Sequence, residues 1–385
     1  MARRQAVVDT AAGLVPFGHL GWAYRTRDEF GLQAARYLAD GLAEGQWVEY
    51  VGAGDPADLH RELADLRRSG ACDVDPDRVA VTPIHEFYDM PADADVVDPD
   101  VAVRRRMAAT EEAVAAGYTG FRAVVDTTPI VGTPAQRECF ARFEFLIDQK
   151  MAVMPVSALC AVDARALGDA AAELTCLHPL TNPGAARFRL YADPAVDAAV
   201  AGEIDMDSSA GLLRALDRIG PLGLGHTLVL DAAELEFVDH RGLDALERYA
   251  RDLDRDIVLR TNRTVIGRLN DLLELSRVHV IEAPACTDRE PGVEEDLLTR
   301  LAHRERQLAT LPDIEQAKGM LEHALGLTES QAFDTLVRLS QHTNTKLREV
   351  AVLLRDELAG TASDRTRRTA EELIVRLHER LRARD

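Results

Sequence analysis

The sequence predicts a multidomain protein with an α/β region built on a parallel sheet, a second and smaller α/β region, and an all-α C-terminal region. Three observations support this. The chain has 385 residues, and at roughly 100–200 residues per domain this length fits two to four domains. Strand and helix patterns alternate up to about residue 283, which is typical of parallel sheets covered by helices. From residue 293 onward every segment has helical periodicity.

In the first region, Thr26-Arg27-Asp28-Glu29 has the spacing of a capping box and predicts a helix to about Leu42. Further helices are expected over 58–69, 100–116, 134–150 and 164–174, and strands over 47–51, 78–84, 121–126 and 153–162. Thr181-Asn182-Pro183-Gly184 is a cluster of helix and strand breakers, so we expect the region to end there.

The second region repeats the pattern in about 100 residues. Its expected helices run over 210–219, from Asp239 through Tyr249, and over 264–273, with Ser208 or Ser209 capping the first and Asp239 capping the second. Its expected strands are 227–230, 257–259 and 278–281. We expect residues 284–297 to form a linker.

The helical region contains five predicted segments. A charged helix with Leu297, Leu301 and Leu308 on one side could pair with another helix. Three short helices then follow, and we expect them to form a small bundle. The first ends at Gly326, the capping box Thr328-Glu329-Ser330-Gln331 opens the second, and Asn344 caps the third. An Arg-rich helix is expected over 365–382.

Composition and charge exclude several classes of protein. With 46% hydrophobic and 29% charged residues, the chain is globular rather than disordered. Its apolar stretches are far shorter than the ~20 residues of a membrane span, and no secretory signal follows Met1. Five scattered cysteines, an odd number, do not indicate a disulfide framework. We therefore expect a cytoplasmic protein.

The net charge of −20 excludes a protein that is basic throughout and coats nucleic acid. The charge is uneven, because residues 298–385 contain 15 Lys and Arg against 14 Asp and Glu, while the rest of the chain contains 30 against 51. The C-terminal region is therefore the segment suited to meet a polyanion.

The C-terminal region resembles the ANTAR domain, an RNA-binding module of bacterial transcription antiterminators. The resemblance rests on Ile314-Glu315-Gln316-Ala317-Lys318-Gly319-Met320-Leu321, followed by Gly326, Ala332-Phe333, Leu336, Ser340, Asn344, Leu347 and Val350-Ala351. It implies a homodimer that recognises paired RNA hairpin loops, whose unstacked bases are open to side chains.

The residues that this resemblance implies for RNA binding are Ala317, Lys318, Gly319, Arg338, Ser340, Asn344, Lys346 and Arg348. We expect Lys318 and Gly319 to lie where helices cross, with Gly319 allowing a close approach and Lys318 reaching phosphate. The alternative is that the small and apolar positions, Ala317 and Gly319 among them, belong only to the core. Many relatives carry a basic residue directly after Leu336, whereas this chain has Val337 there and Arg338 one place later.

The middle region resembles a STAS domain, the fold of anti-sigma-factor antagonists, from about residue 187 to 283. The resemblance rests on Gly202-Glu203-Ile204-Asp205, Leu228-Val229-Leu230-Asp231 and Phe237-Val238-Asp239-His240-Arg241-Gly242-Leu243. The family pattern at the switch loop is Asp-Ser-Ser-Gly, with a serine phosphorylated by a partner kinase. Here the loop is Asp239, His240, Arg241 and Gly242, so we expect docking or internal coupling without phosphorylation.

The first region resembles the MEDS domain, a sensory module related to RecA/KaiC-type folds. The resemblance rests on His19 with Trp22-Ala23-Tyr24, Trp47–Val51, Gly120-Phe121-Arg122, Ala158–Asp163 and His178-Pro179-Leu180. It implies an unidentified small-molecule or protein input. The strand ending in Gly52-Ala53-Gly54-Asp55 lacks the Lys and Ser/Thr of a phosphate-binding loop. We therefore do not expect an enzyme.

Three residues are candidates for a ligand pocket in this region. His19 is either a pocket residue or a structural histidine, Asp126 ends a parallel strand where α/β sheets place their sites, and Cys160 lies in a buried strand. Cys176 and His178 are further residues of metal-binding type. The spacing of these histidines and cysteines matches no zinc signature, so we expect no metal and no cofactor.

We expect a signal-responsive regulator that binds a paired-hairpin leader RNA and controls antitermination. The predicted parts are a sensory domain (1–181), a STAS-like domain (187–283), a linker (284–297), the ANTAR domain with its leading helix (298–360) and an Arg-rich helix (361–385). The alternative is an anti-sigma-factor-antagonist type of regulator that binds a regulatory protein through the STAS-like domain, with an ANTAR segment that only dimerises.

Overall fold

The computed structural model describes residues 5–14, 18–68, 74–91, 93–219, 227–282, 316–322, 325–343 and 350–354. The expected linker, the leading charged helix, the cap at Asn344 and the Arg-rich helix lie outside the described residues. The chain divides into two compact units, one of Arg3–Cys286 and one formed mainly by Thr287–Asp385. No described helix has the length and the apolar character that crossing a membrane requires.

The first unit begins with a sheet of seven parallel strands in the order β1-β7-β2-β6-β5-β3-β4. The strands are β1 (Ala6–Val7), β2 (His19–Tyr24), β3 (Trp47–Gly52), β4 (Ala80–Pro83), β5 (Phe121–Asp126), β6 (Val156–Asp163) and β7 (Leu180–Thr181). Nearly every residue of the central strands β5 and β6 is buried. Such continuous burial is the property of parallel sheets with helices on both faces, and it confirms the predicted parallel α/β region.

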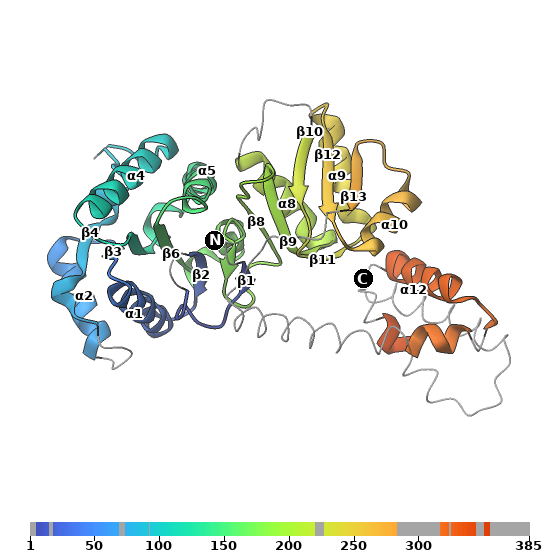
Figure 1. Ribbon diagram of the computed structural model, residues 1–385, viewed down its shortest axis with the longest axis horizontal. Helices are drawn as coiled ribbons and strands as arrows, with labels where there is room; N and C mark the ends of the chain where they lie inside the picture. Colours follow the sequence, from blue (N-terminus) through green and yellow to red (C-terminus); the bar gives the residue numbers. More distant parts are fainter. Residues whose placement is uncertain are drawn as a thin grey trace. The chain divides into compact units, whose positions relative to one another are not determined.

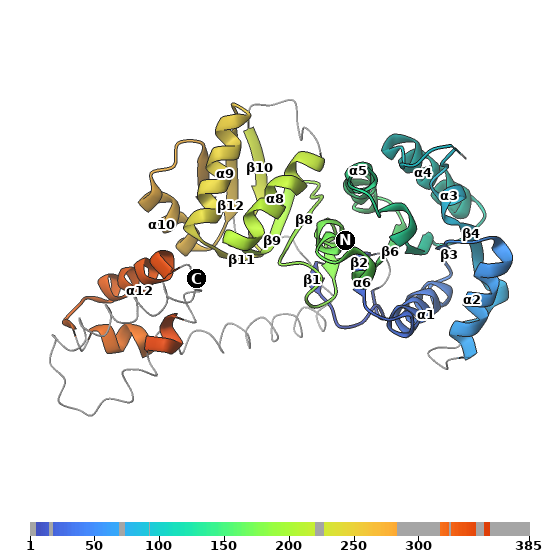
Figure 2. The same ribbon diagram turned by 180° about the vertical axis from the view of Figure 1, so that it is seen from behind.

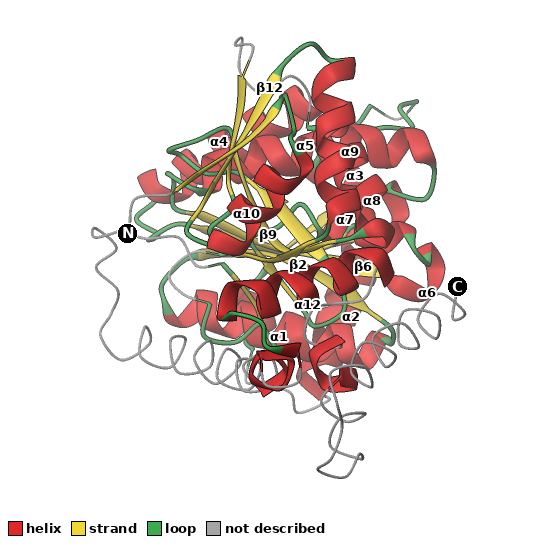
Figure 3. Cartoon of the chain, turned by 90° about the vertical axis from the view of Figure 1, so that its right-hand side faces the viewer, coloured by secondary structure: helices red, strands yellow, loops and turns green. Residues whose placement is uncertain are grey.

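Helices cover both faces of this sheet, with α1 and α2 on one face and α4 and α5 on the other (Figure 1). The helices are α1 (Arg27–Ala43), α2 (Pro56–Arg68), α3 (Ile84–Phe87), α4 (Pro99–Ala115), α5 (Pro134–Met151), α6 (Ala164–Leu167) and α7 (Ala170–Thr175). Short 3-10 turns occupy Pro76–Arg78 and Thr128–Ile130. Figure 3 shows the helices, α6 and α7 among them, in red and the strands in yellow.

Local signals explain most of these boundaries, and three of the predictions need correction. Thr26 caps α1 by accepting from the Glu29 amide, but the Glu29 carboxylate accepts from Arg25, so only half of the predicted capping box forms. The helix expected over 164–174 is two helices, because Gly168 has a φ of +56° that interrupts it. The predicted strand over 78–84 is a 3-10 turn followed by β4 and α3.

The second sheet has the order β11-β9-β10-β12-β13, with β8 antiparallel to β9 and the other pairs parallel. Its strands are β8 (Phe188–Tyr191), β9 (Ala198–Ile204), β10 (Thr227–Asp231), β11 (Leu235–Val238), β12 (Asp256–Thr261) and β13 (Val278–Glu282). Its helices are α8 (Met206–Arg218), α9 (His240–Asp252) and α10 (Thr264–Leu273), and α8 and α9 lie side by side (Figure 2). The sequence patterns did not predict β8, β9 and β11 as strands.

The caps of α8 and α9 come from two aspartates. Asp239 caps α9 as predicted, accepting from the Gly242 amide at 2.7 Å. The prediction that Ser208 or Ser209 caps α8 is wrong, because Asp205 does so in a capping box whose third helical position is Ser208. The helix therefore begins four residues earlier than expected, at Met206.

The second unit contains the helical residues 316–322 and 350–354 and the helix α12 (Glu329–Thr343). These three stretches contribute to one buried apolar cluster of Ala317, Leu321, Ala332, Leu336, Leu339, Val350, Ala351 and Leu354. The predicted capping box at the start of α12 is confirmed, since Thr328 and Gln331 each accept from the other's backbone amide.

Candidate functional site

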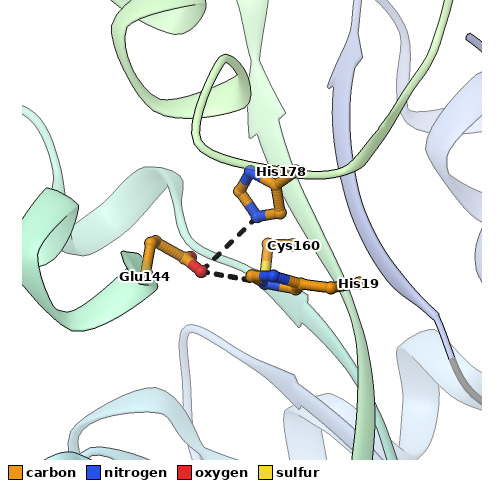
Figure 4. A group of neighbouring side chains, drawn as sticks. All are labelled: His19, Glu144, Cys160 and His178. Atoms are coloured by element: carbon orange, nitrogen blue, oxygen red, sulfur yellow. Dashed lines mark hydrogen bonds and ion pairs between the residues drawn. The ribbon is translucent and has the colours of Figure 1, made fainter. Parts of the chain in front are cut away.

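Four side chains of metal-binding type meet on one face of the first sheet. His19 lies on β2, Cys160 on β6 and Glu144 on α5, and His178 lies between α7 and β7 (Figure 4). None of the four is more than 5% exposed. Their ligand atoms all lie within 4.8 Å of one another, although the residues span 160 positions of the chain.

Sheet register explains how β2 and β6 contribute to this cluster. The two strands are parallel neighbours in which His19 pairs with Ala158 and Gly21 pairs with Cys160. Because side chains alternate along a strand, His19 and Cys160 point to the same face. Helix α5 covers that face with the apolar residues Phe140, Phe143 and Ile147, and Glu144 lies within the same buried stripe.

Gly21 makes room for the imidazole ring of His178. A Cβ at position 21 would lie 2.7 Å from His178 Nδ1 and 3.1 Å from the Thr175 carbonyl oxygen. The histidine ring therefore occupies the space above β2 that any larger residue at position 21 would fill. Its centroid lies 4.2 Å from the centroid of the His19 ring.

The distances within the cluster are short. His19 Nε2 lies 3.0 Å from Glu144 Oε2, and His178 Nε2 lies 3.4 Å from the same oxygen. Cys160 Sγ lies 3.7 Å from His19 Nε2 and 3.8 Å from Glu144 Oε2. Two imidazole nitrogens, one carboxylate oxygen and one sulfur therefore surround one point in the interior.

The other nitrogen of each histidine is held by an acceptor outside this group. His19 Nδ1 lies 2.6 Å from Asp148 Oδ1, and His178 Nδ1 lies 3.2 Å from the Leu174 carbonyl oxygen. Asp148 Oδ2 in turn accepts from the Ala192 amide at 2.8 Å. These contacts fix both rings with Nε2 directed toward Glu144.

Burial and mutual charge set the protonation of the cluster. Burial acts to lower the pKa of His19, but Asp148 and Glu144 outweigh it and the pKa is raised. Burial acts to raise the pKa of Glu144, but His178 and His19 outweigh it and hold the pKa at about 2. Burial, with the Glu144 charge, raises the pKa of the Cys160 thiol well above its usual value.

Two buried atoms of the cluster have no hydrogen bond despite these short distances. Glu144 Oε1 and His178 Nε2 make none within the described part of the chain.

A small cavity adjoins the cluster. It measures about 20 Å³ and its wall is mostly aromatic and apolar, with Glu144 and Cys160 among its lining residues. The Tyr88 hydroxyl has no hydrogen-bond partner among the described residues, and the Arg106 guanidinium lies over the Phe87 ring at 3.7 Å. A volume of this size holds about one water molecule, so an organic ligand would require these side chains to move.

The structure brings two of the three predicted pocket residues together. His19 and Cys160 share the cluster, whereas Asp126 lies on the opposite face of the sheet, because its neighbour Val125 is the register partner of Cys160. There Asp126 accepts from Tyr24 Oη at 3.0 Å and from Arg27 at 2.6 Å.

Sequence reasoning missed Glu144 and Asp148, and it considered Cys176 as a residue of metal-binding type. Cys176 is buried away from the cluster, with Sγ 3.5 Å from the Glu173 carbonyl oxygen. The two carboxylates are four residues apart on α5, and both are fully buried. Acidic residues on the apolar face of a helix are unusual, and this was the signal in the sequence that could have found them.

The predicted switch loop lies at the N-terminus of α9. Asp239 is buried and joins two helix starts, since it accepts from Gly242 and also from the Met206 amide at 3.2 Å. Arg241 is exposed and contacts the Met206 sulfur. His240 is partly buried, and its Nδ1 has no hydrogen-bond partner among the described residues. Gly242 packs tightly, because a Cβ there would lie 2.8 Å from Ile204 Cγ2.

Five of the eight predicted RNA-binding residues are described. Ala317 and Ser340 are buried, Gly319 and Arg338 are exposed, and Lys318 is only 6% exposed. No atom of the described residues lies within 4 Å of a Cβ built at Gly319, so the close helix approach expected there is not found. Asn344, Lys346 and Arg348 lie outside the described residues.

Comparison with protein families identifies both ends of the chain. Residues 18–179 match the family described as MEDS: MEthanogen/methylotroph, DcmR Sensory domain. Residues 300–354 match the family described as ANTAR domain. The resemblances of the two terminal regions are thereby confirmed, and the STAS resemblance of the middle region remains a prediction. No curated protein matches the chain.

Proposed function

We propose that this protein is a signal-responsive regulator that binds RNA hairpins through its C-terminal region and controls transcription antitermination. The observation that carries the proposal is the presence of a MEDS sensory domain and an ANTAR domain in one chain. The first supplies the input and the second the RNA-binding output. In this proposal the protein acts as a homodimer, and its middle region transmits the signal.

The exposed residues of the C-terminal region support an RNA contact at Arg338 rather than at Lys318. The Arg338 side chain is exposed on α12, opposite the buried positions Leu336 and Leu339. Lys318 is buried, so its ammonium would have to leave its present environment to reach a phosphate. Gly319 is exposed, and no described residue lies within 4 Å of a Cβ built there, which suits close approach of a base or of a second copy.

Contacts between the first sheet and the second offer a route for the signal. The Leu190 amide donates to the Cys176 carbonyl at 2.6 Å, two residues from His178. Arg218 of α8 forms ion pairs with Glu173 at 2.9 Å and with Glu138 of α5 at 3.0 Å. In this proposal, the input shifts the population between RNA-competent and masked states through such contacts.

The test is binding of the full chain to a panel of two-hairpin RNAs at two salt concentrations. Arg338→Ala is expected to weaken binding and to reduce the salt slope by about one, as for loss of one phosphate contact. The control is Arg248→Ala, which removes a similarly exposed arginine from α9. If no RNA binds to the full chain, the RNA-binding proposal is wrong. If RNA binds but both variants behave alike, the proposed contact at Arg338 is wrong.

A second candidate is a regulator of the anti-sigma-factor-antagonist type that binds a protein partner through the second sheet. The observation that favours it is the exposure of Arg241 and Met206 beside the buried cap Asp239. Binding of a purified sigma-factor regulator that is lost in Arg241→Glu but kept in Arg338→Ala would favour this candidate over the first.

A further inference from the structure

We propose that His19, Glu144, Cys160 and His178 bind one divalent zinc ion. The proposal concerns the first sheet alone and does not depend on whether the C-terminal region binds RNA. The ligands would be Nε2 of each histidine, Sγ of Cys160 and Oε2 of Glu144. All four side chains belong to one compact unit and are already directed toward a common point (Figure 4).

Four of the six separations between the ligand atoms are close to those of a tetrahedral site. Bonds of about 2.0–2.3 Å from zinc to nitrogen, oxygen and sulfur put neighbouring ligand atoms roughly 3.3–3.6 Å apart at tetrahedral angles. The separations measured here are 3.0 and 3.4 Å between oxygen and nitrogen, and 3.7 and 3.8 Å from sulfur. An ion would therefore need shifts of only a few tenths of an ångström at these four edges.

The charges of the site balance around a divalent ion. One thiolate and one carboxylate supply two negative charges, and the two imidazoles bind as neutral ligands. A divalent ion bound to these groups gives a first shell with no net charge, which suits a fully buried position. Imidazole nitrogen with thiolate sulfur in a tetrahedral set is the donor combination that favours zinc over magnesium or calcium.

The outer contacts are those that orient histidine ligands. A histidine that binds metal usually donates its other ring N–H to a carboxylate or a backbone carbonyl, which fixes the tautomer. His19 Nδ1 meets Asp148, and His178 Nδ1 meets the Leu174 carbonyl. Both rings thereby keep the Nε2 lone pair free for the ion.

The unsatisfied atoms argue against a purely structural hydrogen-bond network. His178 Nε2 and Glu144 Oε1 are buried without a hydrogen bond within the described ranges, and such atoms normally cost stability. A bound ion would satisfy His178 Nε2 and would replace the proton otherwise needed between His19 and Glu144. Each of the four ligand atoms at the centre of the cluster would then bind the ion.

The site is closed and would act on conformation rather than on a substrate. With four protein ligands no coordination position is left for a reacting molecule, as in structural zinc sites. The ion would join β2, β6, α5 and the segment before β7. Asp148 connects this set to Ala192, at the start of the second α/β region, so loading and loss of the ion would alter that junction.

The first test is the metal content of the full chain, produced in zinc-supplemented medium and freed of loosely bound ions. We expect one zinc per chain, lost in Cys160→Ser and in His178→Gln. The matched control is Cys176→Ser, which changes another buried cysteine of the same domain. A metal-free wild type, or equal loss of zinc in Cys176→Ser and Cys160→Ser, would overturn the proposal.

The second test uses cobalt as a spectroscopic probe of the ligands. Full chain produced with Co²⁺ should show thiolate-to-cobalt charge transfer and the visible bands of tetrahedral cobalt. Cys160→Ser should lose the charge-transfer band, and Asp148→Asn should weaken metal affinity about 10–100-fold. Bound cobalt without a thiolate band would contradict the ligand set.

Some cluster variants could fail to fold, so one measurement needs no substitution. A strong chelator should lower the thermal unfolding midpoint of the wild type, and added zinc should restore it, because an ion that binds only the folded state stabilises it. A midpoint that neither the chelator nor added zinc changes would exclude the site.

Discussion

The two faces of the first sheet bury polar groups in different ways. On the face covered by α1, Arg122 is fully buried, and its three nitrogens donate to Gln46 at 2.6 Å and to the carbonyls of Tyr37 and Leu14. On the face covered by α5, four possible metal-ligand atoms, from His19, Glu144, Cys160 and His178, lie around one point. Two polar atoms of this group have no hydrogen bond among the described residues.

The difference separates a structural group from a candidate binding site. A buried arginine whose three nitrogens each donate to a carbonyl or amide oxygen contributes to stability without a bound ligand. In our proposal, the buried group of two histidines, a cysteine and a carboxylate binds a metal ion instead, and two of its polar atoms have no hydrogen bond among the described residues. The following predictions test this distinction, from the largest effect to the smallest.

Arg122→Leu should have the largest effect on stability and none on metal content. It removes the buried hydrogen bonds from Arg122 to Gln46, Tyr37 and Leu14, and we expect a loss of about 3–5 kcal/mol. Chemical denaturation with parallel metal analysis measures both quantities. Arg104→Leu, at an exposed position of α4, should cost less than about 0.5 kcal/mol. Selective loss of metal in Arg122→Leu would remove the distinction between the two faces.

Glu247→Gln extends the comparison to a hydrogen-bonded carboxylate on α9, a helix of the second α/β region. The Glu247 carboxylate accepts from the amides of Ser276, Arg277 and Val278 at 3.1, 2.8 and 3.0 Å. We expect the variant to lose about 2–3 kcal/mol at neutral pH, as for hydrogen bonds to a charged group. The measurement is the free energy of unfolding as a function of pH.

The pH dependence of this effect has a definite sign. Burial acts to raise the pKa of Glu247, but hydrogen bonds from Ser276, Arg277 and Val278 outweigh it and hold the pKa at about 2, against an ordinary 4.5. Because the unfolded chain takes up the proton first, the stabilisation is complete above about pH 5 and is lost as the pH falls toward 2. Glu236→Gln, at an exposed position, is the control, and equal pH profiles for both variants would contradict the prediction.

Gly21→Ala should disturb the cluster without touching a proposed ligand. The new Cβ would lie 2.7 Å from His178 Nδ1 and must displace the ring, which we expect to cost about 1–3 kcal/mol by overpacking and to abolish stoichiometric zinc binding. Gly132→Ala is the matched control, since its nearest atom would be Gln136 Oε1 at 3.7 Å. Full zinc content in Gly21→Ala would show that His178 is not a ligand.

Asp126→Asn should have the smallest effect. Asp126 lies on the face opposite Cys160, and its partner Arg27 is half exposed, so we expect a loss of about 1 kcal/mol or less and unchanged zinc content. Thermal unfolding and metal analysis of the same samples provide the check. A drop in zinc content would place Asp126 in the site after all.

Local sequence patterns predicted most helices and strands of the first unit. Strand 121–126 and helix 264–273 have the predicted ends, because the hydrophobic periodicity that predicts them is a local property of the sequence. The strands β1, β2, β7, β8, β9 and β11 escaped prediction, since strands are stabilised by neighbours that are distant in the sequence. The break at Gly168 escaped for a related reason, because a positive φ is a property of the folded backbone rather than of composition.

The candidate site was only partly accessible from the sequence. His19, Cys160 and His178 were recognised as residue types, but their spacing of 141 and 18 positions matches no local metal signature. The parallel register of β2 and β6 brings the first two together, and the glycine at position 21 admits the third. Glu144 was hidden within an otherwise apolar helix stripe.

The sequence by itself determined the α/β character of the front of the chain, the helical character of its end, and the two family resemblances that the comparisons confirmed. Those properties follow from hydrophobic period, turn residues and short motifs, which are local. Only the tertiary structure decided that Asp126 lies apart from His19 and Cys160, that Lys318 is buried, and that four ligand atoms meet within 4.8 Å. Strand order and register are set by packing across the whole sheet, and no short stretch of sequence encodes them.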